Sequence, residues 1–229
     1  STDAGGLSVE KAFTISINDV NDPFIISTDK SSPNWVAPSW TEDEGAAAFD
    51  PNIQLFDEDA PSTPVSKGRV WMMIGNAASG DHLDLSTDTT GDVYRVRVVD
   101  ATGTRDDIFV RDSGNLIKLG TTDGVSNFRT NVLDVALTDD ATISLVQKFL
   151  REVRFNNLTG GPAYDRTVTI ALKVYDTYGV RNDPYFGKLN VIAKPDAPVI
   201  TSTLTTPVVY TENSAAISVD GTLWLSDPD

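Results

Sequence analysis

The 229-residue chain contains no cysteine, a single histidine and no long apolar run. The missing cysteine excludes disulfide bonds and thiolate zinc sites. No stretch approaches the roughly 18 apolar residues that a membrane-spanning helix needs, so we expect no direct membrane insertion. His82 has no Gly-x-Ser-x-Gly or metal-pair motif nearby, and no pair of carboxylates stands out at an apolar position. We therefore expect no enzyme activity.

Basic residues are also scarce. The chain has 18 Lys and Arg against 33 Asp and Glu, a net charge of −15. Such a surface repels nucleic acid and anionic membranes, so we expect neither as a partner. It favours cations, held either diffusely or at fixed sites. An acidic surface that only keeps the protein soluble is the alternative, and charge alone does not distinguish the two.

Most of the chain alternates between apolar and polar residues. This two-residue period predicts strands over residues 13–17, 93–99, 131–137 and 168–174. Glycine- and aspartate-rich turns separate them, as in Asp112-Ser113-Gly114-Asn115. One stretch, residues 140–154, has apolar residues at helical spacing, and Asp139 and Asp140 are placed to cap it. The sequence predicts an all-β sandwich with one short crossover helix.

The segment Thr41–Asp59 recurs without a gap as Thr211–Asp229, an offset of 211 − 41 = 170. Such periodicity indicates a tandem array. Asp22-Pro23 and Asp196-Ala197-Pro198 mark equivalent boundaries. We expect residues 1–22 to close one repeat, residues 23–196 to form a complete repeat and residues 197–229 to open the next.

The linker Asp19-Val20-Asn21-Asp22 resembles the Asp-x-Asn-Asp that ends a cadherin repeat. Asp57-Glu58-Asp59 and Asp227-Pro228-Asp229 resemble the Asp-x-Asp of the following repeat, and Glu42 and Glu212 resemble its early glutamate. The whole chain is similar to the cadherin-like tandem repeats of large bacterial surface adhesins. The resemblance implies an Ig/cadherin-like β-sandwich, an extracellular location at the bacterial cell surface, and Ca²⁺ at the joints between repeats. The family's internal Asp-Arg-Glu is reduced to Asp165-Arg166-Thr167, and the linker at Lys194-Pro195-Asp196 has lost its asparagine and one aspartate.

Calcium takes six to eight oxygen ligands from carboxylates, amides and backbone carbonyls. The acidic clusters supply such oxygens at both boundaries. For the first junction we expect a set of five aspartates and one asparagine: Asp3, Asp19, Asn21, Asp22, Asp57 and Asp59. For the second we expect five acids: Glu42, Asp176, Asp196, Asp227 and Asp229. A shared ion would turn repulsion between neighbouring repeats into a rigid joint.

Two other interpretations remain open. Aspartate and asparagine beside proline and glycine are common turn residues, so each cluster could be a solvated loop. The chain could also be a carbohydrate-binding β-sandwich of an extracellular protein, with tryptophans as stacking platforms. We expect Trp71 in the core and consider Trp35 and Trp40 as exposed candidates. Expected partners are calcium, neighbouring repeats of the same chain, and a cell-surface protein or glycan.

Overall fold

The part of the chain that the structure describes consists mainly of β-strands with one helix, so the all-β prediction is confirmed. The computed structural model describes residues 4–6, 10–16, 20–27, 37–57, 65–101, 103–123, 128, 130–158 and 164–227. The first strands are β1 (Ile25–Ser27), β2 (Ser39–Thr41), β3 (Ala47–Ala48), β4 (Gln54–Phe56), β5 (Arg69–Gly75) and β6 (Asp81–Asp84). There follow β7 (Val93–Asp100), β8 (Gly103–Asp112), β9 (Asn115–Thr122), β10 (Val132–Leu137), α1 (Ile143–Glu152) and β11 (Arg154–Asn157). The last are β12 (Arg166–Tyr175), β13 (Tyr185–Ile192), β14 (Val199–Thr201) and β15 (Trp224–Ser226).

An eight-stranded sheet is the largest layer, with the order β2-β13-β12-β5-β10-β9-β8-β7. Its neighbours are antiparallel except β2 and β13, which run parallel. Side chains alternate between the two faces. In β5, Val70, Met72 and Ile74 are buried, while Trp71 lies on the other face under the ammonium of Lys173. One face therefore packs on the core and the other meets solvent, the usual arrangement of an antiparallel sheet.

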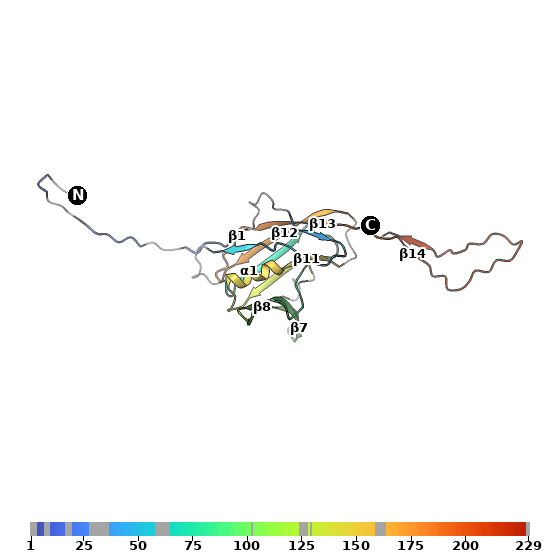
Figure 1. The fold of residues 1–229 in the computed structure, drawn as a ribbon, viewed down its shortest axis with the longest axis horizontal. Helices are drawn as coiled ribbons and strands as arrows, with labels where there is room; N and C mark the ends of the chain where they lie inside the picture. The colour runs from blue at the N-terminus through green and yellow to red at the C-terminus, as the bar shows by residue number, and fades with distance from the viewer. Residues whose placement is uncertain are drawn as a thin grey trace.

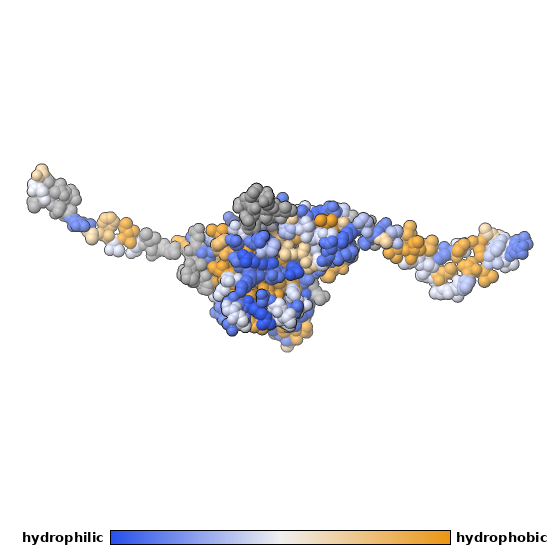
Figure 2. Space-filling view, viewed as in Figure 1, coloured by the Kyte–Doolittle hydropathy of each residue, from blue (hydrophilic) through white to orange (hydrophobic). Residues whose placement is uncertain are grey.

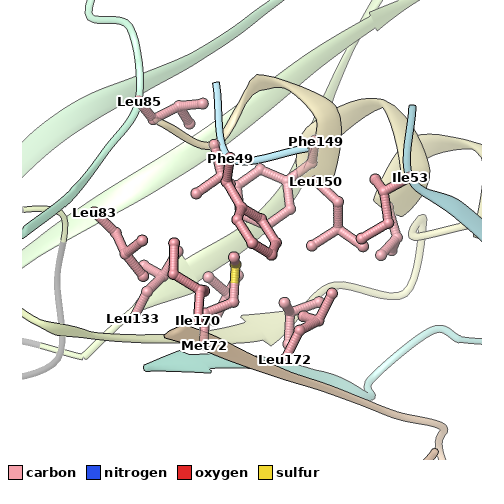
Figure 3. Packing of buried hydrophobic residues seen from close by; sticks show 14 of the residues in the cluster. Phe49, Ile53, Met72, Leu83, Leu85, Leu133, Phe149, Leu150, Ile170 and Leu172 are labelled. Carbon is pink, nitrogen blue, oxygen red and sulfur yellow. The ribbon is translucent and has the colours of Figure 1, made fainter. Parts of the chain in front are cut away.

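The core lies between this sheet and a second layer made of α1, the β1–β4 pair and the three-stranded sheet β3-β11-β6. Figure 3 shows Phe49 between Phe149 and Leu150 of the helix and the sheet residues Met72 and Ile170. All five side chains are at least 98% buried. The helix is positioned by its apolar stripe, which the sequence predicted, and its ends lie inside the predicted range.

The helix cap differs from the prediction. Thr142, not Asp139 or Asp140, is the N-cap, and its Oγ1 accepts a hydrogen bond from the Leu145 amide at 3.3 Å. Asp139 instead pairs with Lys67 at the surface. The observed cap lies three residues after Asp139 and two after Asp140, and the helix begins at Ile143.

Replacing Thr142 by alanine should lower the free energy of unfolding by about 1 kcal/mol, because one amide of the first turn loses its acceptor. Urea unfolding followed by circular dichroism measures this. Thr142→Ser keeps the hydroxyl and should stay within about 0.5 kcal/mol of the parent. Equal losses in both variants would contradict the capping role.

The predicted strand over residues 13–17 is not found in its described part, residues 13–16. Phe13 and Ile15 are largely exposed there. In the described part of the chain no strand lies beside this segment, and an alternating segment forms a strand only when another strand satisfies its backbone groups. Figure 1 shows this arm leaving one end of the central body and residues 199–227 leaving the other.

The repeated segment has the same local geometry in both copies. Asp43 and Asn213, 170 residues apart, both adopt φ 65° inside matching turns. The strands β4 and β15 are also 170 residues apart, and each closes a two-stranded antiparallel pair, with β1 and with β14. Between β1 and Thr41 there are 41 − 25 = 16 positions, against 211 − 199 = 12 in the second copy. The second copy is therefore four residues shorter at this point.

The two copies differ in the burial of their apolar residues. In the first copy Trp40, Phe49, Ile53 and Leu55 are core residues. Their counterparts 170 positions later are exposed: Tyr210, Val219, Leu223 and Leu225. Figure 2 shows apolar colouring along the arm that residues 199–227 form. Matching sequence thus produces a matching hairpin in both copies, but only the first hairpin has a sheet and a helix to pack against.

Candidate metal centres at the two junctions

The first junction comprises the linker residues 20–24 together with the chain segments that surround them. Asp176 belongs here. It follows β12 and closes a turn in which its Oδ1 accepts hydrogen bonds from the amides of Tyr178 and Val180, both at 2.8 Å. Gly179 provides the positive φ, 81°, that the turn requires. The Asp176 side chain is buried and fixed, and its second oxygen faces the linker.

Asn21 reaches this second oxygen across 155 residues of sequence. Its Nδ2 donates to Asp176 Oδ2 at 2.6 Å. Among the described residues, the other amide atom, Asn21 Oδ1, is buried and has no hydrogen-bond partner. A buried amide oxygen without a donor costs free energy unless a cation or water occupies the space beside it. Its chemistry, a hard neutral oxygen beside a carboxylate, suits Ca²⁺.

Asp57 comes to the same end of the molecule through β4. The strand β4 pairs with β1 so that Phe56 faces Ile25. One position further along, Asp57 lies at the level of Phe24, next to the linker. Asp22 is exposed and Asp57 half-buried. The predicted ligands Asp3, Asp19 and Asp59 lie outside the described residues, as does Asp229 of the second set.

The assignment of Asp176 to the second junction is wrong. The strand β12 runs from the second junction to the first and contains 10 residues. At about 3.4 Å per residue, its two ends are roughly 30 Å apart, far beyond any shared coordination sphere. The sequence held the signal: residues 167–175 and the strand that ends before Lys194 form an antiparallel hairpin, so Asp176 and Lys194 must lie at opposite ends.

The second junction comprises residues 193–198 and the acids that hold them. Glu42 is 2% exposed, and its Oε2 accepts the Lys194 amide at 2.9 Å. Asp165 belongs to the Asp165-Arg166-Thr167 segment, described above as a reduced Asp-Arg-Glu motif. Its Oδ1 accepts a hydrogen bond from the Ala193 amide at 2.9 Å. Asp196 is half-buried in the linker. Asp227 follows β15 at the level of Pro198, as Asp57 lies at the level of Phe24.

No group of three or more Asp, Glu, His or Cys is arranged to hold a metal among residues that the structure describes. The first junction brings together Asn21, Asp176 and the end of β4, and the second brings together Glu42, Asp165 and the linker backbone. The described side chains thus form two incomplete oxygen sets. Asp19 and Asp59, outside the described range, are adjacent in sequence to the first set.

The tryptophans that the structure describes differ in their exposure. Trp40 is 3% exposed and packs edge-on against Phe155, so the expectation of an exposed Trp40 is wrong. Trp71 is half-buried on the outer face, contrary to the core prediction, because it falls on the opposite side of β5 from Met72. Trp224 is exposed, and Trp35 lies outside the described residues. His82 is buried in β6, with Nδ1 3.1 Å from the Gly80 carbonyl.

No protein-family model, curated protein or solved structure matches this chain. Within the described residues, no helix combines the length and the apolar character needed to cross a bilayer.

Proposed function

We propose that this chain is a calcium-binding stretch of a cadherin-like tandem array, in which Ca²⁺ at the first junction makes the joint between repeats rigid. In this proposal residues 23–196 form an Ig/cadherin-like β-sandwich. The array serves as an extender or adhesive module of a bacterial cell-surface adhesin. Calcium, neighbouring repeats and a cell-surface protein or glycan are its partners.

The observation that carries the proposal is the contact between Asn21 and Asp176. A linker residue is hydrogen-bonded to the turn at the far end of β12, and among the described residues no donor reaches its buried amide oxygen. A turn-forming asparagine in a solvated loop would leave this oxygen in water. The linker instead presents it beside a fixed carboxylate, as a ligand for a hard cation would be presented.

Electrostatics supplies the mechanism. Two carboxylates about 4 Å apart repel by roughly 1 kcal/mol in water and about four times as much at an effective dielectric constant near 20. Asp22 belongs to the linker, and Asp57 and Asp176 approach it from two other segments of the chain. A divalent ion would reverse the sign of this interaction and attach the linker to the body. Residues Asn21, Asp57 and Asp176 would hold it, with Asp19, Asp22 and Asp59 completing the oxygen set.

The position of the two linkers fits a rod. Figure 1 shows that the chain enters the central body at one end and leaves at the other. A repeat that is entered and left at opposite ends lengthens an array by its full long dimension. Rigidity of each joint would then decide whether the array extends away from a surface or folds back on itself.

Calcium at 100 times its Kd should stabilise the chain by about 2.7 kcal/mol, which corresponds to a Tm about 5–10 °C higher than in chelator. Asp57→Asn should remove most of this increase. Asp227→Asn is a matched control, because Asp227 is the exposed counterpart of Asp57 170 residues later. Calorimetry measures Tm, and small-angle scattering measures the maximum dimension. Equal Tm and dimension with calcium and with chelator would refute the proposal.

A further inference from the structure

The two linkers can be aligned through the hairpins that follow them. Ile25 pairs with Phe56, and Val199 pairs with Ser226. The second members differ by 226 − 56 = 170 and the first by 199 − 25 = 174. Linker residues therefore correspond at an offset of 174. In this alignment Asp19, Val20, Asn21 and Asp22 become Ala193, Lys194, Pro195 and Asp196. The linker charge changes from −2, from two aspartates, to zero, from one lysine and one aspartate.

Lys194 contacts two acidic residues of the second junction, one through its backbone and one through its side chain. Its amide donates to the buried Glu42 Oε2 at 2.9 Å, and its Nζ lies 3.3 Å from Glu44 Oε1. The preceding amide, of Ala193, donates to Asp165 Oδ1. One oxygen each of Glu42, Glu44 and Asp165 is therefore already engaged by the linker itself. At the first junction the corresponding position is Val20, which carries no charge.

We propose that Lys194 is the resident cation of the second junction, which is therefore held together without calcium. The inference rests on the proposed function insofar as calcium is expected at the first junction. This chain would then contain joints of two kinds, one controlled by the calcium concentration and one independent of it.

Three features of the linker support this assignment. The Lys194 ammonium pairs with Glu44, and its positive charge offsets part of the negative charge that would otherwise attract a divalent ion to this linker. Pro195 replaces Asn21, so the side-chain amide that bonds to Asp176 at the first junction has no counterpart. Proline also restricts its own φ and the conformation of Lys194, which stiffens the linker without an ion.

The test measures the backbone order of the second linker in the full chain, with EDTA present to remove calcium. Order parameters from ¹⁵N relaxation of Ala193, Lys194, Asp196 and Ala197 should be about 0.85, as in rigid backbone. Lys194→Ala should lower them below about 0.6. Lys188→Ala, an exposed lysine of β13 in the same hairpin, should leave them unchanged. Unchanged order in Lys194→Ala, or linker order that appears in the parent only after calcium is added, would overturn the proposal.

Calcium stoichiometry from titration calorimetry separates this proposal from the one above. Asp57→Asn should remove most of the calcium binding of the parent chain, whereas the double variant Glu42→Gln, Asp165→Asn should bind as many ions as the parent. Loss of an ion in the double variant would overturn the role of Lys194. Absence of calcium binding in the parent would refute the proposed function instead, and the order parameters in EDTA would still decide the role of Lys194.

Discussion

Replacing Asp81 by alanine is expected to lower the free energy of unfolding by about 3–5 kcal/mol, the cost of removing one partner from a buried ion pair. The Asp81 carboxylate is fully buried and accepts four hydrogen bonds from three donors. Arg166 Nη2 lies 2.6 and 2.7 Å from its two oxygens, and the Ala78 amide and the Asn157 side chain complete the set. The Arg166 side chain is only 12% exposed, so the mutation leaves a positive charge in the interior.

The position of this pair in the fold explains the size of the effect. Asp81 begins β6 of the three-stranded sheet, and Arg166 begins β12 of the eight-stranded sheet. The pair therefore joins the two layers at the end of the molecule where the second junction lies. Asp165, the acid that holds the second linker, precedes Arg166 directly.

Urea unfolding followed by tryptophan fluorescence measures the loss. The control is Asp139→Ala, which breaks the surface pair with Lys67, where both side chains are more than two-thirds exposed. This control should cost about 1 kcal/mol or less. If the Asp81 and Asp139 variants lost the same amount, the pair with Arg166 would not hold the layers together.

Phe49→Ala should also lower the free energy of unfolding by about 3–5 kcal/mol, because it removes a buried ring and leaves a cavity. Phe49 is 1% exposed, packs edge-on against Tyr185, and lies directly over Gly187 of β13. A Cβ at Gly187 would come within 2.3 Å of the Phe49 ring. The Phe49 ring and Gly187 are therefore complementary in shape. The backbone of β13 cannot fill the cavity that Phe49→Ala leaves.

The internal repeat provides a matched control. Val219 occupies the position of Phe49 in the second copy and is 79% exposed. Val219→Ala should change the free energy of unfolding by no more than about 0.5 kcal/mol. Thermal and urea unfolding of both variants give the comparison. A cost above about 1 kcal/mol at Val219 would show that residues 197–227 take part in the cooperative unfolding of the central body.

Strands and the helix were predictable where apolar and polar residues follow a regular period over several residues. Strands over residues 93–99, 131–137 and 168–174 and the helix within 140–154 are present. The predicted turn Asp112-Ser113-Gly114-Asn115 joins β8 to β9, with positive φ at Ser113 and Gly114. The period of side chains along a segment is a local property, and a single sequence displays it.

Contacts between distant segments were not predictable in the same way. Trp40 and Trp71 were both misplaced, because composition cannot tell which face of a short strand meets the core. The helix cap was misplaced by two to three residues, since tertiary packing determines where the helix begins. Asp176 was assigned to the wrong linker. Because β12 and β13 are antiparallel, Asp176 at the end of β12 lies at the opposite end from the linker that follows β13.

The sequence by itself determined the strand-rich class, the 170-residue repeat and the acidic linkers, because alternation, recurrence and charge are properties of neighbouring residues. Only the tertiary structure decided which acids meet. It placed Asp176 beside Asn21, brought Asp165 and Glu42 to the backbone of the second linker, and paired Lys194 with Glu44. The physical reason is that strand direction and sheet order, which arise from packing over the whole chain, decide which end of the molecule each side chain reaches.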